Sequence, residues 1–221
     1  MAKPISLTKR RRPAPGRKKK LTRVERSEIT RRALFNAAVA VVGEVGYDNA
    51  MIAEITARAD VAHGTFYNYF ESRQDLFDAL LPELGGEMLA FIREETKECR
   101  DEIEREERGF RAFFTFLKTR PEFYRVLYEA EVFAPEAFKR HVETVAGKYV
   151  GALQHAIANG QLKPHDPKAL EAIVFMLMGT RHYLCMQYAR RDSQTVSLPE
   201  WVVKIYMELV TRNLFQKKAT S

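Results

Sequence analysis

The segment at positions 46–73 restricts the fold of this chain more than any other part, because it predicts two short helices joined by a tight turn. An amphipathic stretch at 24–45 precedes it, with apolar side chains at helical spacing. Thr22 and Glu25 match a capping box at the start of that stretch, and Gly46 is placed to end it. We therefore expect a long helix followed by a helical hairpin.

The hairpin is expected to contain a second helix, a turn at 60–61 and a third helix at 62–70. Asn49 is positioned to cap the second helix, because its side-chain oxygen can accept a hydrogen bond from the first turn. The inward face of that helix is expected to carry Ile52, Ile55 and Ala59. Ser72, with Asp75 three residues later, predicts the start of a fourth, longer helix.

The third helix has an apolar side and a polar side. Phe66 and Phe70 are four residues apart, so both lie on the side that packs on the first two helices. Small and polar residues make up the rest of this helix: His63, Gly64, Thr65, Tyr67, Asn68 and Tyr69. In a helix-turn-helix the N-terminal tip of the second helix reaches base edges in the major groove, and hydroxyl and backbone N–H groups suit phosphate oxygens. We therefore expect this segment to bind DNA. The alternative is a helical hairpin that only packs in an all-α core.

The same segment resembles the DNA-binding head of the TetR family, also called TetR/AcrR, of bacterial transcriptional regulators. The family pattern has a glycine and an aromatic residue, an Ile-Ala helix, Ala-Gly-Val-Ser, and then Gly-Thr-Leu-Tyr-x-Tyr-Phe-x-Ser-Lys. The corresponding residues here are Gly46-Tyr47, Ile55-Thr56, Ala59-Asp60-Val61-Ala62 and Gly64-Thr65-Phe66-Tyr67-Asn68-Tyr69-Phe70-Glu71-Ser72-Arg73. The resemblance covers about a quarter of the chain. It implies an all-α protein of about nine helices, with a three-helix head at 21–72. A helical domain at 73–217 would hold an effector and dimerise through its last two helices.

Three residues depart from the family pattern. Asp60 stands where the family has glycine, and Asp tolerates the left-handed conformation that this turn needs. Ala62 stands in place of serine, which removes a helix N-cap typically worth ~1 kcal/mol. Arg73 replaces lysine and keeps a cation for a phosphate group, so it is counted among the expected DNA-binding residues.

The basic character of the chain is concentrated at its N-terminus. Of the 36 Lys and Arg residues, nine lie within residues 1–20, which contain no acidic residue. Residues 21–221 thus hold 27 basic and 29 acidic side chains, although the whole chain has a net charge of +7. The segment 1–20 also contains three prolines and one glycine, so it predicts a disordered tail. Such arms contact the DNA backbone or the minor groove beside a helix-turn-helix. The alternative is a solvated tail without DNA contact.

Other features narrow the class of protein. No apolar stretch is long enough to span a membrane, and the basic N-terminus lacks the hydrophobic segment of a signal peptide. Cys99 and Cys185 are widely separated, which fits thiols in a reducing cytoplasm. The five histidines show no metal-ligand spacing, and the sequence has no nucleophile elbow and no glycine-rich phosphate loop. His182 and Cys185 are three residues apart, but such a pair on an apolar helix is more often core. We therefore expect a cytoplasmic protein that is not an enzyme and needs no metal or cofactor.

Proline, glycine and capping residues divide positions 73–217 into further helices. The boundaries predict helices at 73–99, from Gly109, after Pro121, at 135–158, at 167–190 and from about Ser197 onwards. The charged residues at 97–108 predict a solvated helix end or linker.

The helical domain is rich in aromatic residues, and half of the fourteen phenylalanines lie between Phe110 and Phe138. The helix expected at 167–190 is apolar nearly all round, so neighbouring helices and a partner subunit must cover it. A few polar groups among these residues indicate a small-molecule cavity, although such clusters more often form core. The candidate cavity residues are Phe113, Phe114, Leu117, Tyr124, Leu127, Tyr128, Met178, Arg181 and His182. Arg181 or His182 is expected to orient a polar or anionic group.

These patterns predict a homodimeric transcriptional regulator. We expect a repressor that binds a palindromic double-stranded operator and is released by a small apolar or aromatic effector. One alternative is a DNA-binding adaptor or packaging protein without an effector, which would bind DNA of any sequence. The other alternative is an enzyme, which would need a catalytic constellation that the sequence does not display.

Overall fold

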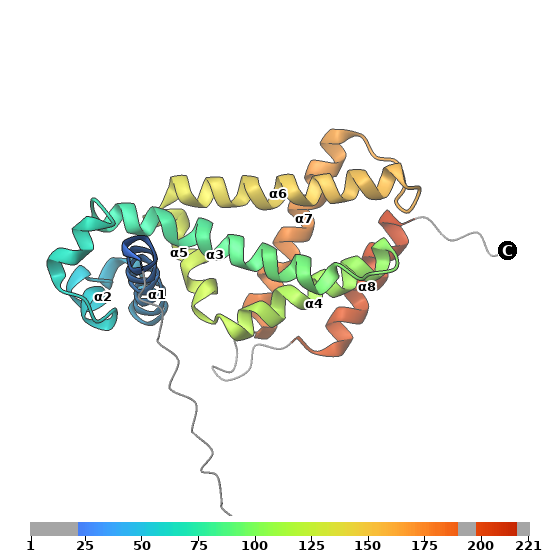
Figure 1. Ribbon diagram of the computed structural model, residues 1–221. Coiled ribbons are helices and arrows are strands. Elements are labelled where there is room, and N and C mark those ends of the chain that lie inside the picture. The colour runs from blue at the N-terminus through green and yellow to red at the C-terminus, as the bar shows by residue number, and fades with distance from the viewer. Residues whose placement is uncertain (1–21, 190–197, 216–221) are drawn as a thin grey trace, which may run out of the picture.

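The computed structural model describes residues 22–189 and 198–215; the basic tail at 1–20 and Ser197 lie outside these ranges (Figure 1). The described residues form eight α-helices: α1 (Arg23–Asn49), α2 (Ile52–Arg58), α3 (Arg73–Thr96), α4 (Glu102–Thr119), α5 (Glu122–Phe133), α6 (Pro135–Ala158), α7 (Pro167–Leu184) and α8 (Glu200–Leu214). A 3-10 helix, η1 (His63–Asn68), lies between α2 and α3, and a π-helix, η2 (Cys185–Ala189), follows α7. In the described ranges no strand forms beyond a single antiparallel bridge between Leu162 and Phe215. The prediction of an all-α fold is confirmed.

The helices α1, α2 and η1 form a head at one end of the molecule, and α3 leads from the head into the body (Figure 1). The capping box that begins α1 is present, since the Glu25 N–H donates to Thr22 Oγ1 at 3.1 Å and the Thr22 N–H donates to Glu25 Oε2 at 2.7 Å. Gly46 has φ of +85° and interrupts α1 at the position where the sequence predicts its end, but α1 continues to Asn49. Asp60 adopts the left-handed φ of 55° that the turn needs.

Two local predictions for the head are wrong. Asn49 does not cap α2; Met51 occupies the cap position, and the Asn49 amide donates to the Val45 carbonyl at 3.2 Å. The reason is that helical geometry resumes after Gly46 and continues to Asn49. The third helix is a short 3-10 helix rather than an α-helix at 62–70, and Ala62 provides no side-chain cap for it.

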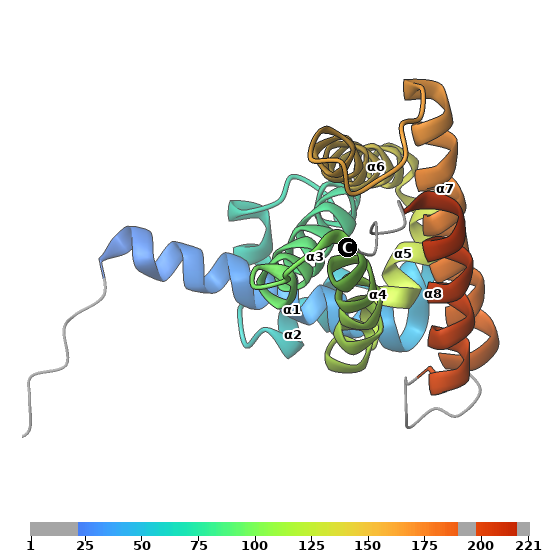
Figure 2. The same cartoon turned by 90° about the vertical axis from the view of Figure 1, so that its right-hand side faces the viewer.

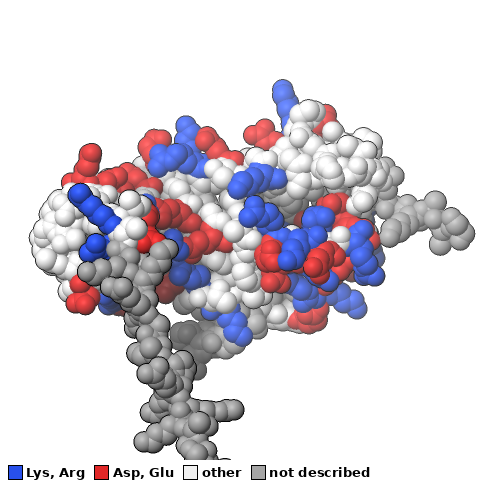
Figure 3. Space-filling model, viewed as in Figure 1, with Lys and Arg blue, Asp and Glu red and all other residues white. Residues whose placement is uncertain are grey.

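The body is built from α3 to α8. Ser72 Oγ accepts the Asp75 N–H at 3.1 Å and begins α3, as predicted. The prediction of a solvated helix end or linker at 97–108, with the next helix starting near Gly109, is wrong for residues 102–108, because α4 already begins at Glu102 with Asp101 as its N-cap. Exposed charges pair along this helix, as Arg111 does with Glu107. Blue and red atoms therefore alternate over this part of the surface (Figure 3).

The long helices α3 and α6 run along the body, and α7 and α8 form one side of it (Figures 1 and 2). That side keeps seven large apolar side chains exposed: Phe175, Met176, Tyr183, Met186, Trp201, Ile205 and Leu209. None of the described helices is long and apolar enough to cross a membrane. Within the described ranges no group of three His, Cys, Asp or Glu side chains is placed to hold a metal ion.

Candidate functional site

The candidate DNA-binding residues lie on the outer side of η1 and at the start of α3. Phe66 and Phe70 are buried beneath η1 with ring centroids 5.6 Å apart, and they fix the segment on the head. The exposed or half-buried residues above them are His63, Gly64, Thr65, Tyr67, Asn68 and Tyr69. A Cβ on Gly64 would meet nothing within 4 Å, so the backbone at this tip is open to a large partner. The arrangement leaves the polar side of the segment available to a duplex.

Arg73, which is expected to contact a phosphate group, also contacts other residues of the protein. Its Nη1 donates to the Asp48 carbonyl at 3.3 Å, and its guanidinium lies over the Phe77 ring at 5.3 Å from the centroid. The hydrogen bond ties the start of α3 to the end of α1, and the ring contact lies within α3. The side chain is half-buried, so part of it still faces solvent.

The end of α1 is also held by α5 (Glu122–Phe133). Arg125 Nη1 donates to the Glu44 carbonyl at 2.8 Å, and the Glu129 carboxylate accepts the Tyr47 N–H at 2.9 Å. Arg125 and Glu129 also bind each other, with Arg125 Nε 2.6 Å from Glu129 Oε1. Gly46 allows this approach, since a Cβ there would come within 2.8 Å of both side chains. Carbonyl and N–H groups left free at the kink thus find charged partners on the body.

A cavity of about 960 Å³ lies in the body among α3, α4, α5, α6 and α7. Seven of the nine predicted cavity residues line it: Phe113, Tyr124, Leu127, Tyr128, Met178, Arg181 and His182. The wall also includes Met88, Leu89 and Ile92 from α3 and Val142, Val145 and Leu153 from α6. The space is therefore largely apolar, with polar groups at particular positions.

Phe114 and Leu117 do not line the cavity, so their assignment to it is wrong. On α4 the lining residues follow helical spacing from Glu102 through Arg105, Glu106 and Gly109 to Phe113. Phe114 and Leu117 belong to the same row as Phe110, at i, i+4 and i+7, and this row points in a different direction. Phe110 stacks on Tyr206 of α8 with centroids 3.8 Å apart, so this row packs as core between helices.

The polar centre of the cavity wall is Glu106. Arg181 Nη2 lies 2.8 Å from Glu106 Oε1, and the Tyr149 hydroxyl donates to Glu106 Oε2 at 2.6 Å. The Tyr206 hydroxyl donates to the same carboxylate. Burial opposes the charged form of Arg181, but Tyr149 and Glu106 outweigh it and hold the Arg181 pKa above its ordinary value. The Arg181 cation is thus already neutralised within the protein.

The rings of His182, Tyr124 and Tyr128 lie nearly parallel to one another, with His182 6.0 Å from Tyr124 and 5.8 Å from Tyr128, and 6.1 Å between the two tyrosines. His141 lines the cavity against Gly85, and burial lowers the pKa of its imidazole to about 4. His141 is therefore neutral at pH 7.

Sequence reasoning missed Glu106 and Tyr149 as members of this wall, and it missed Tyr206, which does not line the cavity but bonds to Glu106 from α8. Glu106 sits within a run of charged residues, which conceals a buried carboxylate. Glu106 lies seven residues before Phe113 and so on the same helix face, which is the sequence pattern that could have predicted its place in the wall. Tyr149 and Tyr206 lie 43 and 100 residues from Glu106, and no local pattern connects them.

Comparison with known proteins assigns the chain to a family. Residues 34–80 match the model of bacterial regulatory proteins of the TetR family. The chain is also 30% identical over 139 residues to the HTH-type transcriptional regulator Mb2936c of Mycobacterium bovis, covering 61% of this chain and 69% of the relative. The chain belongs to the TetR family. The resemblance inferred from positions 46–73 is thereby confirmed.

Two further relatives of this TetR-family protein are matched over less of their length. The fatty acid metabolism regulator protein of Bacillus subtilis is 35% identical over 65 residues, covering 29% of this chain and 34% of the relative. The HTH-type transcriptional activator FasR of Mycolicibacterium smegmatis is 31% identical over 121 residues, covering 54% and 53% respectively. The chain thus spans about a third and about half of these two relatives.

Solved structures show the same fold. The fatty acid degradation regulator FadR of Bacillus halodurans superimposes with a TM-score of 0.70 at 21% identity, covering 83% of this chain and 95% of the other. A TetR family regulator of Marinobacter aquaeolei VT8 gives 0.65 at 20% identity, covering 88% and 100%. The head and the helical body are therefore arranged as in other TetR-family proteins.

Proposed function

We propose that this TetR-family protein is a dimeric transcriptional repressor whose operator binding is released by a small, elongated and mainly apolar effector. The observation that carries the proposal is the double role of α5. Tyr124, Leu127 and Tyr128 line the cavity, while Arg125 and Glu129 hold the end of α1. A molecule that shifts α5 must therefore act on the head.

The shape and lining of the cavity support an elongated effector. Its volume of about 960 Å³ lies at the upper end of the range for small-molecule sites, about 300–1,000 Å³. The lining residues of α3 run from Gly86 to Thr96, which corresponds to about 15 Å of helix. Two relatives are named for fatty acid metabolism or degradation. We therefore propose that the effector contains an acyl-like chain.

The proposed dimer is formed by the exposed apolar side chains of α7 and α8. Met176, Tyr183 and Leu209 are 69%, 71% and 60% exposed in the single chain. Several large apolar side chains exposed on neighbouring helices are costly to leave in water and commonly mark a protein interface. Two heads in one dimer would bind two half-sites about one DNA turn, or a multiple of it, apart.

The proposed response follows from thermodynamic linkage. An effector can lower operator affinity only if it binds the DNA-free arrangement of the two heads more tightly than the DNA-bound arrangement. To move this equilibrium from 1:99 to 99:1, the binding free energies of the effector for the two arrangements must differ by ~5.5 kcal/mol.

The test begins with selection of binding sites from random duplexes by the full chain. We expect an enriched inverted repeat, and dodecanoate, as the effector probe, is expected to release the selected duplex. Met178→Trp should fill the cavity and abolish release while leaving operator affinity unchanged. Gly151→Trp is the matched control, because a Cβ at this exposed position of α6 meets nothing within 4 Å and the residue does not line the cavity.

Selection without an enriched palindrome would contradict the dimeric operator. Equal affinity for all duplexes, with a steep salt dependence, would instead support an adaptor or packaging protein without an effector. Tighter operator binding in the presence of the probe would contradict repression with release and support activation.

A further inference from the structure

We propose that Arg93 and Lys148 form a binding site for an anionic group at one end of the cavity, so that the effector is an amphipathic anion with its chain inside. This inference rests on the proposed effector function of the cavity. It replaces Arg181, the residue first expected to orient an anion, with two cations on other helices.

The cation inside the cavity wall, Arg181, already has a counter-ion within the protein. Arg181 pairs with Glu106, and its guanidinium also lies 5.3 Å from the centroid of the Tyr149 ring. An effector carboxylate at this position would have to displace Glu106 or lie beside it. Two carboxylates in such a buried place repel each other, so this position disfavours an anion.

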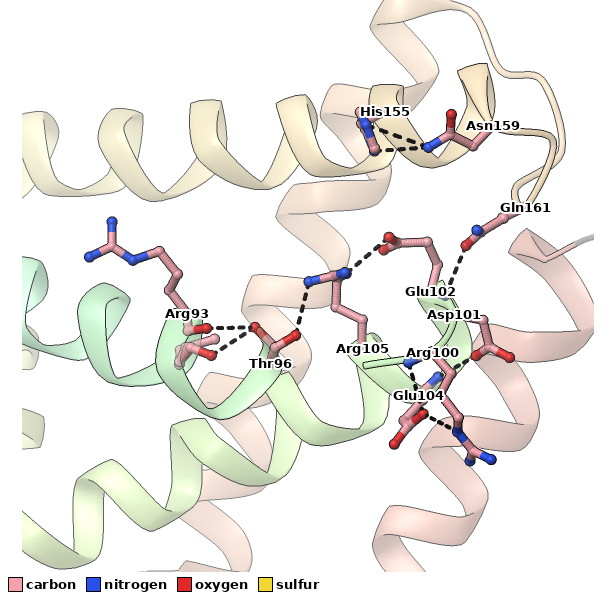
Figure 4. Close-up of polar contacts among 11 residues, drawn as sticks. Arg93, Thr96, Arg100, Asp101, Glu102, Glu104, Arg105, His155, Asn159 and Gln161 are labelled. Carbon is pink, nitrogen blue, oxygen red and sulfur yellow. Dashed lines mark hydrogen bonds and ion pairs between the residues drawn. The ribbon is translucent and has the colours of Figure 1, made fainter. Parts of the chain in front are cut away.

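Two other cations line the cavity without a counter-ion among the described residues. Arg93 on α3 and Lys148 on α6 are both exposed, and neither forms an ion pair with another residue of the described ranges. Figure 4 shows the Arg93 guanidinium extended from α3 towards α6, away from the neighbouring polar contacts. Basic side chains also gather between α3 and α6 on the surface seen in Figure 3.

A third cation supports this end of the cavity. Arg105 Nη1 donates to the Thr96 carbonyl at 3.0 Å, and Arg105 Nε donates to Glu102 Oε1 at 2.9 Å (Figure 4). The Glu102 N–H in turn donates to the Gln161 side chain at 2.9 Å. These bonds join the α3–α4 turn to the loop after α6. Polar contacts therefore hold the α3–α4 turn and the loop after α6 together at this end of the cavity.

Two of the three acidic lining residues are paired with a cation, Glu102 with Arg105 and Glu106 with Arg181, which leaves Glu131. The acidic residue of α5 that lines the cavity, Glu131, lies near Phe138 at the start of α6. Phe138 and Lys148 are ten residues apart on α6, about 15 Å along its axis. His141, between them, is uncharged at pH 7. An anion at the Arg93 end therefore avoids Glu131, and an apolar chain can extend past Leu89, Ile92 and Val145.

The test compares three probes of equal chain length, used below the concentrations at which they form micelles: dodecanoate, dodecyl phosphate and 1-dodecanol. Binding to the full chain is measured by isothermal titration calorimetry at two salt concentrations. We expect both anions to bind more tightly than the alcohol. Arg93→Gln combined with Lys148→Gln should weaken anion binding about tenfold, since exposed ion pairs each contribute modestly. Alcohol binding should stay unchanged.

Arg100→Gln is the matched control, because Arg100 is exposed at the same end, pairs with Glu104 and does not line the cavity. It should leave all three affinities as they are. The relative affinity of the carboxylate and the phosphate then distinguishes a free fatty acid from a phosphorylated or phosphate-linked acyl compound.

Two results would overturn the inference while leaving the effector cavity intact. One is equal binding of the alcohol and the anions to the unaltered protein, and the other is unchanged anion affinity in the double variant. If none of the three probes binds, the proposed acyl-like effector itself is wrong, and the anion site is refuted with it.

Discussion

At the scale of single residues, we expect η1 to carry both side chains that position the protein on DNA and side chains that read bases. The Tyr67 ring is 54% exposed, and its hydroxyl suits a phosphate oxygen. Asn68 is exposed beside it, and an amide can bond two positions of one base edge. Phe66 is buried and holds both in place.

Tyr67→Ala is expected to weaken binding to operator and random duplexes alike, because a hydrogen bond to phosphate is independent of base sequence. Asn68→Ala should instead relax the preference at one base position, where a good bidentate bond to a base is worth ~1–3 kcal/mol. Fluorescence anisotropy with the operator, single-base variants and a random duplex measures both effects. A weakening at only one base position for Tyr67→Ala would show that its partner is a base.

At the scale of elements, α5 connects the cavity to the head through Glu129, which accepts the Tyr47 N–H at 2.9 Å. Glu129→Ala is expected to destabilise the fold by ~1–3 kcal/mol, since hydrogen bonds to charged groups contribute about this much. The variant should still bind dodecanoate, because Glu129 does not line the cavity. Operator release by dodecanoate should be reduced, because one of the two links from α5 to the end of α1 is lost, while that of Arg125 to the Glu44 carbonyl remains.

Chemical denaturation, calorimetry with dodecanoate and operator titration measure these three quantities separately. Val132→Ala is the control on the same helix, since Val132 is 74% exposed and does not line the cavity. Full release of the operator by dodecanoate from Glu129→Ala would show that the signal reaches the head by another route, such as α3.

At the scale of the whole molecule, the structure shows how little free positive charge the folded head has for DNA. Three of its arginines are paired with acids: Arg31 with Glu83, Arg32 with Glu87 and Arg58 with Glu44. The nine basic residues at 1–20 are then the largest group of positive charges next to the head in the sequence.

Deletion of residues 1–20 is expected to weaken operator binding and flatten its salt dependence. The slope of log affinity against log salt should fall by ~0.9 for each phosphate group that the shortened protein no longer neutralises. Thermal unfolding should be unchanged, since α1 begins at Arg23 with its own capping box. Equal affinity and equal slope with and without the tail would show that it does not touch the DNA.

The sequence by itself determined the features that depend on neighbours along the chain. The capping box of Thr22, the positive φ of Gly46 and Asp60, and the cap at Ser72 all involve hydrogen bonds or backbone sterics within a few residues. Such interactions are the same wherever the segment is placed. Helix existence and most helix boundaries could therefore be predicted.

Only the tertiary structure decided which neighbour each helix face meets. Helical spacing shows that Phe113 differs in direction from Phe114 and Leu117, but not which row faces a cavity. Glu106 meets Arg181 from 75 residues away, and Arg125 reaches a carbonyl 81 residues away. Such pairings depend on how whole helices pack, because a periodic pattern defines the apolar face of a helix and not the partner that covers it.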